Sequence, residues 1–130
     1  MPYRDAPLAD RSIVILIVED DLILRDLLAE VMTEMGAKVH TAPTADAGWD
    51  AVMEHPELNL LITDVVTPGT ATGWDLAARV HEQKPDLPVI VTSGFSAKHA
   101  ADLPPNATFL AKPWSLTEIC TLVNSSLERR

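Results

Sequence analysis

Short apolar runs alternate along the chain with longer amphipathic stretches. Residues 13–18 form a continuous run rich in β-branched side chains, which is typical of a strand buried on both faces. Further short apolar runs predict strands over residues 37–41, 58–63, 88–92 and 107–111. The chain therefore offers five candidate strands, each short enough to belong to one compact sheet.

The stretches between and after these runs have the spacing of helices. We predict helices over residues 21–35, 44–54, 74–83, 96–102 and 115–127. In the first, apolar residues at positions 24, 27, 28, 31 and 35 repeat with the helical period, and Gly36 is placed to end the helix. In the second, Trp49 and Val52 are expected to face inward. In the last, Ser115 and Glu118 have the spacing of a capping box.

Strands that alternate with helices imply βαβ units, and therefore a parallel sheet with helices on both faces. We expect an α/β fold built on a single doubly wound, five-stranded parallel sheet. A length of 130 residues fits one domain. Residues 1–11 contain no apolar segment of the secretory kind, and we expect them to form a flexible leader before a domain spanning residues 12–130.

The charge balance narrows the range of partners. The chain carries 19 acidic and 10 basic residues, for a net charge of −9. Because DNA and anionic membranes are polyanions, direct binding to nucleic acid or to a membrane surface is not expected. The one cysteine, Cys120, excludes a disulfide within the chain and favours a reducing, cytoplasmic location, with the thiol buried in the last helix.

Polar residues follow four of the predicted strands. Glu19 and Asp20 follow the first strand, and Asp64, Ser93 and Lys112 follow the third, fourth and fifth. In a parallel α/β sheet the ligand site lies beyond the carboxyl ends of the strands, so these five side chains are expected to converge. Crowded carboxylates repel one another and favour recruitment of a cation, for which Mg²⁺ or Mn²⁺ is the natural choice.

This combination has a specific chemistry. An aspartate beside a divalent metal, an ammonium group and a hydroxyl can attack phosphorus and form an acyl phosphate. Each residue alone has a simpler explanation. An acidic pair after a strand commonly lies in a solvated loop or complements a helix N-terminus, and a single aspartate at a strand end is commonly a cap or turn residue. Only the set of strand ends taken together indicates a site.

The same segments resemble a known family. Residues 15–21 (ILIVEDD), 60–69 (LLITDVVTPG), 88–94 (PVIVTSG) and 109–114 (FLAKPW) are similar to the four signature segments of response-regulator receiver domains of two-component signalling systems. The resemblance covers about residues 12–128. It implies a flavodoxin-like, chemotaxis-regulator-like fold with strand order 2-1-3-4-5.

The resemblance also implies roles for the strand-end residues. Asp64 would be the phosphoacceptor, and Lys112 would bind the phosphoryl group. The metal would be held by the side chains of Glu19, Asp20 and Asp64 and by the backbone carbonyl of Val66. The domain would catalyse its own phosphorylation and dephosphorylation, with a histidine kinase or a histidine phosphotransfer protein as the phosphohistidine donor.

Two further residues would form the conformational switch. Ser93 would be the hydroxyl that moves toward the phosphoryl group, and Phe109 the aromatic side chain that rotates with it. Thr92 competes for the role of Ser93. We favour Ser93 because it lies five residues after Pro88 and directly before Gly94. Leu22 and Ile23, which open the first helix beside the site, are a candidate docking surface for the phosphodonor; partial burial under the neighbouring loop is the simpler alternative.

The chain departs from the family pattern in two regions. Thr67 stands where methionine is usual, and the loop to Gly73 is one residue longer. The segment between Ser93 and Lys112 is about three residues shorter, which reduces the face that many DNA-binding regulators use for dimerisation. Val66 and Phe95 flank the expected path of the hydrolytic water, and their apolar character predicts a long-lived phosphorylated form, with ordinary loop packing an equal alternative.

Three other functions are compatible with parts of the pattern. A phosphatase of the haloacid-dehalogenase type needs a second aspartate two residues after the nucleophile, where Leu22 or Val66 stands instead. A flavodoxin-like cofactor binder needs a neutral phosphate loop after the first strand, where three acidic residues stand. A receiver-like docking module that works without phosphorylation is the third. The chain itself could act as a stand-alone regulator, a phosphate shuttle or the receiver of a hybrid histidine kinase.

Overall fold

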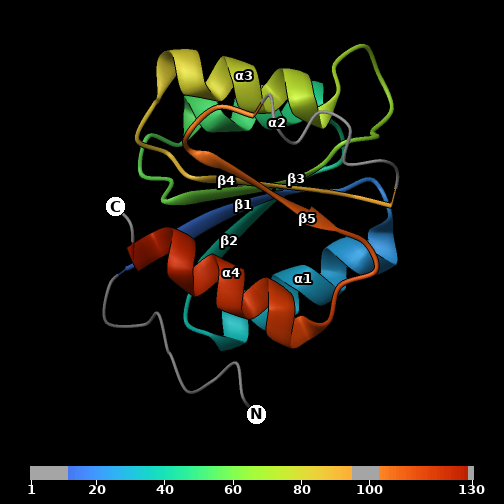
Figure 1. The fold of residues 1–130 in the computed structure, drawn as a ribbon, viewed down its shortest axis with the longest axis vertical. Helices are drawn as coiled ribbons and strands as arrows, with labels where there is room; N and C mark the ends of the chain where they lie inside the picture. The colour runs from blue at the N-terminus through green and yellow to red at the C-terminus, as the bar shows by residue number, and fades with distance from the viewer. Residues whose placement is uncertain (1–11, 95–102, 129–130) are drawn as a thin grey trace.

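The computed structural model of the protein describes residues 12–94 and 103–128 (Figure 1). Five strands form one sheet in the order β2-β1-β3-β4-β5, and all four strand pairs are parallel. The strands are β1 (Val14–Val18), β2 (Lys38–Ala42), β3 (Leu60–Asp64), β4 (Val89–Ser93) and β5 (Ala107–Ala111). This confirms the parallel five-stranded sheet and the strand order that the resemblance implied.

Four helices cover the sheet within the described residues. They are α1 (Leu22–Glu34), α2 (Ala45–Glu54), α3 (Gly73–Gln83) and α4 (Leu116–Glu128). Figure 1 shows α2 and α3 on one face of the sheet and α1 and α4 on the other. The predicted leader at residues 1–11 and the predicted helix at residues 96–102 lie outside the described residues.

The helix starts differ from the predictions by one residue, and the reason is capping. Asp21 and Thr44, which we expected to open α1 and α2, adopt extended backbone angles and accept hydrogen bonds from backbone N–H groups of the first turn. They are therefore N-caps rather than helical residues. The predicted capping box of α4 is confirmed, because Ser115 and Glu118 exchange hydrogen bonds of 2.9 and 3.0 Å.

The sheet separates two apolar cores, and side chains of one strand alternate between them. Ile15 and Ile17 of β1 contribute to the core that contains α1 and α4 residues, whereas Leu16 and Val18 contribute to the core under α2 and α3. All five residues of β1, β3 and β4 are buried, as expected of central strands covered on both faces.

One predicted core position is wrong. Leu27, part of the apolar stripe expected for α1, is 41% exposed, while Leu28, Val31 and Met32 are buried. The face of α1 that meets the sheet is centred on residues 28, 31, 32 and 35, at the i, i+3, i+4 and i+7 spacing. Leu27 lies about 100° around the helix from Leu28 and falls at the border of this face.

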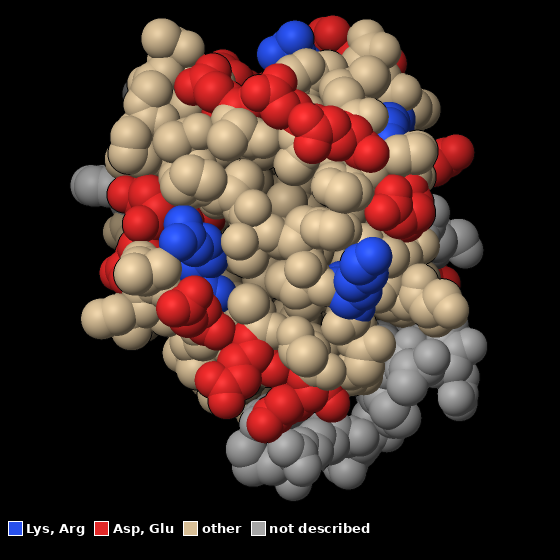
Figure 2. Space-filling model, turned by 180° about the vertical axis from the view of Figure 1, so that it is seen from behind, with Lys and Arg blue, Asp and Glu red and all other residues tan. Residues whose placement is uncertain are grey.

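The surface agrees with the acidic composition. In Figure 1 the edge strand β5 is nearest the viewer, so the reverse view in Figure 2 shows the side of the other edge strand, β2. There Asp and Glu side chains gather in several groups, while Lys and Arg occupy small separate areas. No helix among the described residues has the length and apolar character needed to cross a membrane.

Candidate functional site

Three carboxylates meet at the carboxyl end of the sheet. Glu19 and Asp20 directly follow β1, and Asp64 is the last residue of the neighbouring strand β3. One carboxylate oxygen of each lies within 4.8 Å of the others. Glu19 and Asp64 are buried, with 3% and 9% of their surface exposed, whereas Asp20 is exposed. The structure therefore brings together the three acidic residues that the strand ends predicted.

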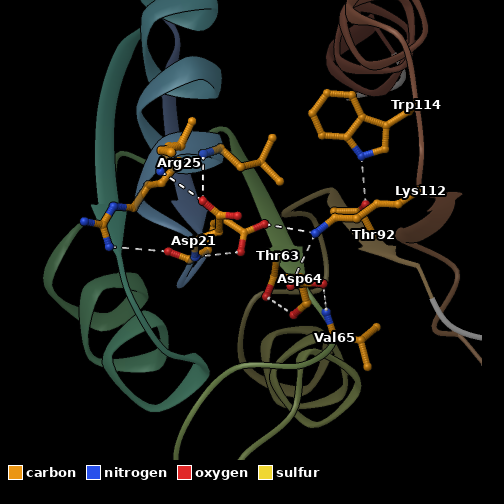
Figure 3. Close-up of polar contacts among 11 residues, drawn as sticks. Asp21, Arg25, Thr63, Asp64, Val65, Thr92, Lys112 and Trp114 are labelled. Atoms are coloured by element: carbon orange, nitrogen blue, oxygen red, sulfur yellow. Dashed lines mark hydrogen bonds and ion pairs between the residues drawn. The ribbon is translucent and has the colours of Figure 1, made fainter.

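Lys112 reaches this acidic group from the end of β5. Its Nζ donates a hydrogen bond to Oε1 of Glu19 at 3.1 Å and forms an ion pair with Oδ2 of Asp64 at 3.4 Å (Figure 3). The backbone N–H of Lys112 donates to the carbonyl of Ser93, which extends the pairing between β4 and β5 by one residue. The lysine thus crosses the end of β4 to reach both buried carboxylates.

Burial dominates the electrostatics of the two carboxyl groups. Desolvation raises the pKa of Glu19, and although hydrogen bonds from Asp21 and Lys112 oppose this, the charge of Asp64 adds to it. Desolvation also raises the pKa of Asp64, against the opposing effects of Lys112 and the Val65 N–H. Burial disfavours the charged form of Lys112, but contacts with Glu19 and Asp64 outweigh it and raise the pKa of Lys112.

The backbone fixes the orientation of Asp64. Its Oδ1 accepts a hydrogen bond from the N–H of Val65 at 2.9 Å, while its Oδ2 faces Lys112 (Figure 3). The hydroxyl of Thr63 donates to the carbonyl oxygen of Asp64 at 2.9 Å. One carboxylate oxygen is therefore held by the main chain and the other is directed at the cationic side of the site.

A close contact behind Asp64 requires glycine at position 73. A Cβ atom placed on Gly73 would lie 2.2 Å from the carbonyl oxygen of Asp64, which is far inside van der Waals contact. The N–H of Gly73 also donates to the carbonyl of Val65 at 2.8 Å. The start of α3 is thus packed directly against the backbone that carries Asp64. No pattern in the sequence indicated this role of Gly73.

The third acidic residue of the run after β1 has a different task. Asp21 caps α1 through its Oδ1, which accepts from the N–H groups of Ile23 and Leu24. Its own N–H donates to Oε2 of Glu19 at 3.1 Å. Arg25, one turn into α1, donates to the carbonyl oxygen of Glu19 at 3.4 Å (Figure 3). Asp21 and Arg25 therefore position Glu19, a role that the sequence did not reveal.

The two candidate hydroxyls differ in their surroundings. Thr92 and Ser93 are both buried, and as consecutive strand residues they face opposite sides of the sheet. The hydroxyl oxygen of Thr92 accepts a hydrogen bond from Nε1 of Trp114 at 2.9 Å (Figure 3). Ser93 is the last residue of β4, opposite Ala111 and beside the strand end that leads to Lys112.

The predicted switch aromatic has a stacking partner. Phe109 of β5 lies against Trp74 in the first turn of α3, with ring centroids 5.8 Å apart and an interplanar angle of 19°. Phe109 is partly buried and packs at the border of the core under α2 and α3. The sequence placed Trp74 in a helix but gave no signal that it would meet Phe109.

The loop after Asp64 is tied to the start of α2. The carboxylate of Asp46 accepts hydrogen bonds from the N–H of Thr70 at 3.2 Å, from the Thr70 hydroxyl at 3.3 Å and from the N–H of Ala71 at 3.4 Å. The Thr67 hydroxyl accepts from the N–H of Ala45 at 2.9 Å. Thr67, the unusual residue in this loop, thus helps to hold it in place.

The remaining predicted residues lie at the rim of the site. Leu22 and Ile23 are 57% and 82% exposed, so the expected apolar pair beside the site is present on the surface. The side chain of Val66 is 52% exposed in the loop that follows Asp64. Phe95, the other residue expected on the path of the hydrolytic water, lies outside the described residues.

Comparison with known proteins assigns the chain to a family. The family model of the response regulator receiver domain matches residues 15–124, most of the chain. The chain belongs to the response regulator receiver domain family. It is a receiver domain of the two-component type, as the four signature segments indicated.

The relatives of this receiver domain occur in different contexts. It is 31% identical over 116 residues to the response regulator receiver protein CpdR of Brucella abortus (strain 2308), covering 87% of this chain and 95% of that protein. It is 34% identical over 116 residues to the DNA-binding transcriptional regulator NtrC of Bradyrhizobium sp. (strain RP501 Parasponia), covering 87% of this chain and 24% of that protein. The chain thus spans about a quarter of the length of NtrC.

A solved structure shares the fold. The response regulator protein TrrA from Thermotoga maritima, in complex with Mg²⁺-BeF, has a TM-score of 0.79 and 26% identity, covering 88% of this chain and 99% of that chain. The receiver architecture therefore extends over nearly the whole length of both proteins.

Proposed function

We propose that this receiver domain accepts a phosphoryl group on Asp64 from the phosphohistidine of a histidine kinase or a histidine phosphotransfer protein. The observation that carries the proposal is the charge balance of the site. Three carboxylates face a single ammonium group, so two negative charges remain uncompensated when all are ionised. A divalent cation restores the balance, and its presence would leave Asp64 ionised and able to react.

The donor set suits Mg²⁺ or Mn²⁺. Glu19, Asp20 and Asp64 provide oxygen ligands, which hard cations prefer, and the backbone carbonyl of Val66 would complete the protein contribution. No nitrogen or sulfur ligand lies in this group. The bound ion would supply charge neutralisation for the oxygens of the transferring phosphoryl group.

The residues of the chain supply positioning and electrostatics. In the transfer, an oxygen of Asp64 forms a bond to phosphorus while the bond from phosphorus to the donor imidazole nitrogen breaks, and the electron pair stays with the imidazole. Lys112 already contacts Asp64 at 3.4 Å, so its ammonium group is close enough to bind a phosphoryl oxygen after transfer. The acyl phosphate so formed is a covalent state of the domain itself, and the domain would also catalyse its hydrolysis.

Ser93 is the proposed switch hydroxyl. The choice of Ser93 rests on its position five residues after Pro88 and directly before Gly94, while the hydroxyl of Thr92 accepts a hydrogen bond from the indole of Trp114 on the α4 side of the sheet. A shift of Ser93 toward the phosphoryl group would alter the end of β4 next to β5, where Phe109 stacks on Trp74. The negative charge added at Asp64 would thereby shift the equilibrium between two conformations of the surface around Ser93 and Phe109.

The TrrA structure supports this reading of the site. That related receiver was solved in complex with Mg²⁺-BeF. The exposed pair Leu22 and Ile23 lies at the start of α1, directly after the capping residue Asp21, and we propose it as the docking surface for the phosphodonor. Neither nucleic acid nor a membrane is part of the proposed function, and its proposed location is the cytoplasm.

The experiment that tests the function separates acyl phosphate from phosphoester. The chain is incubated with acetyl phosphate and Mg²⁺, and half of the sample is then treated with hydroxylamine. The intact mass of the protein in both halves is measured by mass spectrometry. We expect one added phosphoryl group that hydroxylamine removes, because acyl phosphates react with this nucleophile and phosphoserine and phosphothreonine do not. A stable adduct would assign the phosphate to a hydroxyl such as Ser93 and contradict the proposal.

The alternatives are distinguished by this assay together with a phosphate-ester turnover assay. A docking module that works without phosphorylation gains no mass, and a phosphatase with an aspartate nucleophile turns over a generic phosphate ester. The phosphatase remains disfavoured because Val66, two residues after Asp64, offers no acid or base.

A further inference from the structure

A second group of metal-ligating side chains lies away from the acidic site. It consists of His40 on β2, His55 at the C-cap of α2 and Glu57 in the connection to β3. We call it the histidine cluster. One ligand atom of each residue lies within 4.8 Å of the others. His55 and Glu57 precede β3, whereas Asp64 ends it, so the cluster and the acidic site lie toward opposite ends of this strand.

The fold brings these residues together for simple reasons. His40 pairs with Leu16 of β1, and Leu16 points into the core under α2 and α3. His40 therefore faces the α2 side of the sheet at its edge, because paired residues of parallel strands point to the same face. The C-terminus of α2 delivers His55 to the same place, and the two rings stack with centroids 3.8 Å apart.

One ring nitrogen in the histidine cluster makes no hydrogen bond to the described residues. Nε2 of His40 is buried and has no hydrogen-bond partner among the described residues. The nearest candidate, Oε2 of Glu57, lies 4.0 Å away, too far for a hydrogen bond. The same Glu57 oxygen contacts Nδ1 of His55 at 3.2 Å. Since buried polar atoms normally find partners, a group bound between these three atoms would satisfy Nε2 of His40.

The chemistry of the three donors selects the group. Two imidazole nitrogens and one carboxylate oxygen form a ligand set that suits Zn²⁺ and similar transition metals, whereas Mg²⁺ prefers oxygen alone. With metal–ligand bonds of about 2.1 Å in a tetrahedron, neighbouring ligand atoms lie about 3.4 Å apart. The observed separations of 3.2 and 4.0 Å bracket that value. A fourth position would remain for water.

We propose that His40, His55 and Glu57 bind a Zn²⁺ ion that ties the end of α2 to the β2 edge of the sheet. A metal lies in the plane of each imidazole that binds it, so the present stack, with an interplanar angle of 19°, opens on binding. Both histidine side chains are partly exposed, at 24% and 28%, which leaves room for this rotation. The net charge of −9 favours the approach of a cation.

The protonation state of His40 is compatible with this role. Burial, together with the charges of His55 and Lys38, lowers the pKa of His40, against the opposing effect of Glu57. A neutral imidazole can bind a metal without first losing a proton.

The test is a zinc titration of the untagged chain in excess Mg²⁺, which competes with Zn²⁺ for the oxygen ligands of the acidic site. We expect one Zn²⁺ per chain in wild type and at least about tenfold weaker binding in His55→Gln and in Glu57→Gln, because each variant removes one of three ligands. Both side chains are partly exposed, so the variants should fold, and circular dichroism melting verifies this. His81→Gln on α3 is the matched control, with affinity within about twofold of wild type.

Spectroscopy provides a second readout. Co²⁺ in place of Zn²⁺ should give the visible absorption of a tetrahedral site in wild type and lose it in His55→Gln. The NMR signals of the His40 and His55 rings should shift as the stack opens. Equal zinc affinity in wild type and His55→Gln would overturn the proposal, and binding that only Asp20→Asn abolishes would place the zinc at the acidic site instead. The absence of binding up to about 1 mM Zn²⁺ would also overturn the proposal.

Discussion

At the scale of single residues, the burial of Asp64 couples the chemistry of the site to the stability of the fold. The pKa of Asp64 is raised in the folded chain, chiefly by desolvation and despite the nearby Lys112. An acid whose pKa is higher in the folded chain than in the unfolded chain stabilises the fold in its protonated form. This contribution to the free energy of unfolding is fully present at pH values below the pKa of the unfolded chain, and it is lost as the pH rises through the pKa of the folded chain. Without a metal, ionised Asp64 therefore destabilises the domain at neutral pH.

Asp64→Asn should accordingly stabilise the metal-free domain. At pH 7.5 in EDTA we expect a gain of about 1 kcal/mol, equivalent to a rise in Tm of about 4 °C for a domain of this size. The difference should shrink toward pH 4, because Asp64 then becomes protonated in wild type. Melting curves of the two proteins across this pH range measure it. A wild type that is more stable than Asp64→Asn at pH 7.5 in EDTA would show that Lys112 outweighs desolvation.

Gly73→Ala should damage the site without touching any proposed ligand. The added Cβ would clash with the carbonyl oxygen of Asp64, so the start of α3 or the end of β3 must move. We expect a loss of about 2 kcal/mol and slower phosphorylation by acetyl phosphate. Gly94→Ala is the control, because its Cβ would come no closer than 3.9 Å to any described atom outside its chain neighbours. Equal behaviour of the two variants would refute the role assigned to Gly73.

The sequence predicted some of these residues and missed others for a physical reason. Glu19, Asp64 and Lys112 each stand directly after an apolar strand, and the carboxyl ends of parallel strands converge, so their meeting could be foreseen. The contacts made by Gly73 and Asp46 depend on how helices and loops pack against those strands. No periodicity or motif along the chain encodes such contacts.

At the scale of secondary-structure elements, β5 and α3 are linked by the stack of Phe109 on Trp74. Hydrophobic periodicity predicted both elements, because it reports which face of an element is buried. It could not predict the stack, which depends on the side-chain directions of two elements far apart in the chain. The misplaced Leu27 in α1 has a similar origin, since the width of the buried face is set by the neighbouring elements rather than by α1 itself.

Rotation of Phe109 on phosphorylation should break or reorient this stack. We expect acetyl phosphate with Mg²⁺ to change the tryptophan emission, and Trp74→Phe to remove most of that change. Trp49→Phe is the matched control, because the ring of Trp49 on α2 packs against the guanidinium of Arg79, whereas Trp74 is the tryptophan that stacks on Phe109. An emission change that survives in Trp74→Phe would show that the signal arises elsewhere, for example at Trp114.

At the scale of the whole molecule, the arrangement of layers followed from the sequence, whereas the order of strands did not. Alternating strands and helices required a parallel sheet covered on both faces. The order β2-β1-β3-β4-β5 came from the resemblance of four short segments to receiver domains, and the structure confirms it. Helices α1 and α2 begin one residue later than predicted, because Asp21 and Thr44 are N-caps with extended backbone rather than helical residues.

The short connection between Ser93 and Lys112 leads to a prediction about assembly. We expect the phosphorylated domain to remain monomeric, because the sequence between Ser93 and Lys112 is shorter than in regulators that dimerise through this face, and a specific interface needs roughly 1,000 Å² of buried surface. Sedimentation velocity with and without a beryllofluoride mimic of the phosphoryl group measures this. A clear dimer that forms only with the mimic would contradict the prediction.

The central claim is that crowded carboxylates recruit a divalent cation, and that Asp64 accepts a phosphoryl group only in its presence. The most direct measurement is the intact mass of the chain after incubation with acetyl phosphate, in Mg²⁺ and in EDTA, for wild type and Asp64→Asn. We predict one added phosphoryl group in wild type with Mg²⁺ and none in the other three samples. Equal labelling in EDTA, or labelling of Asp64→Asn, would contradict the account.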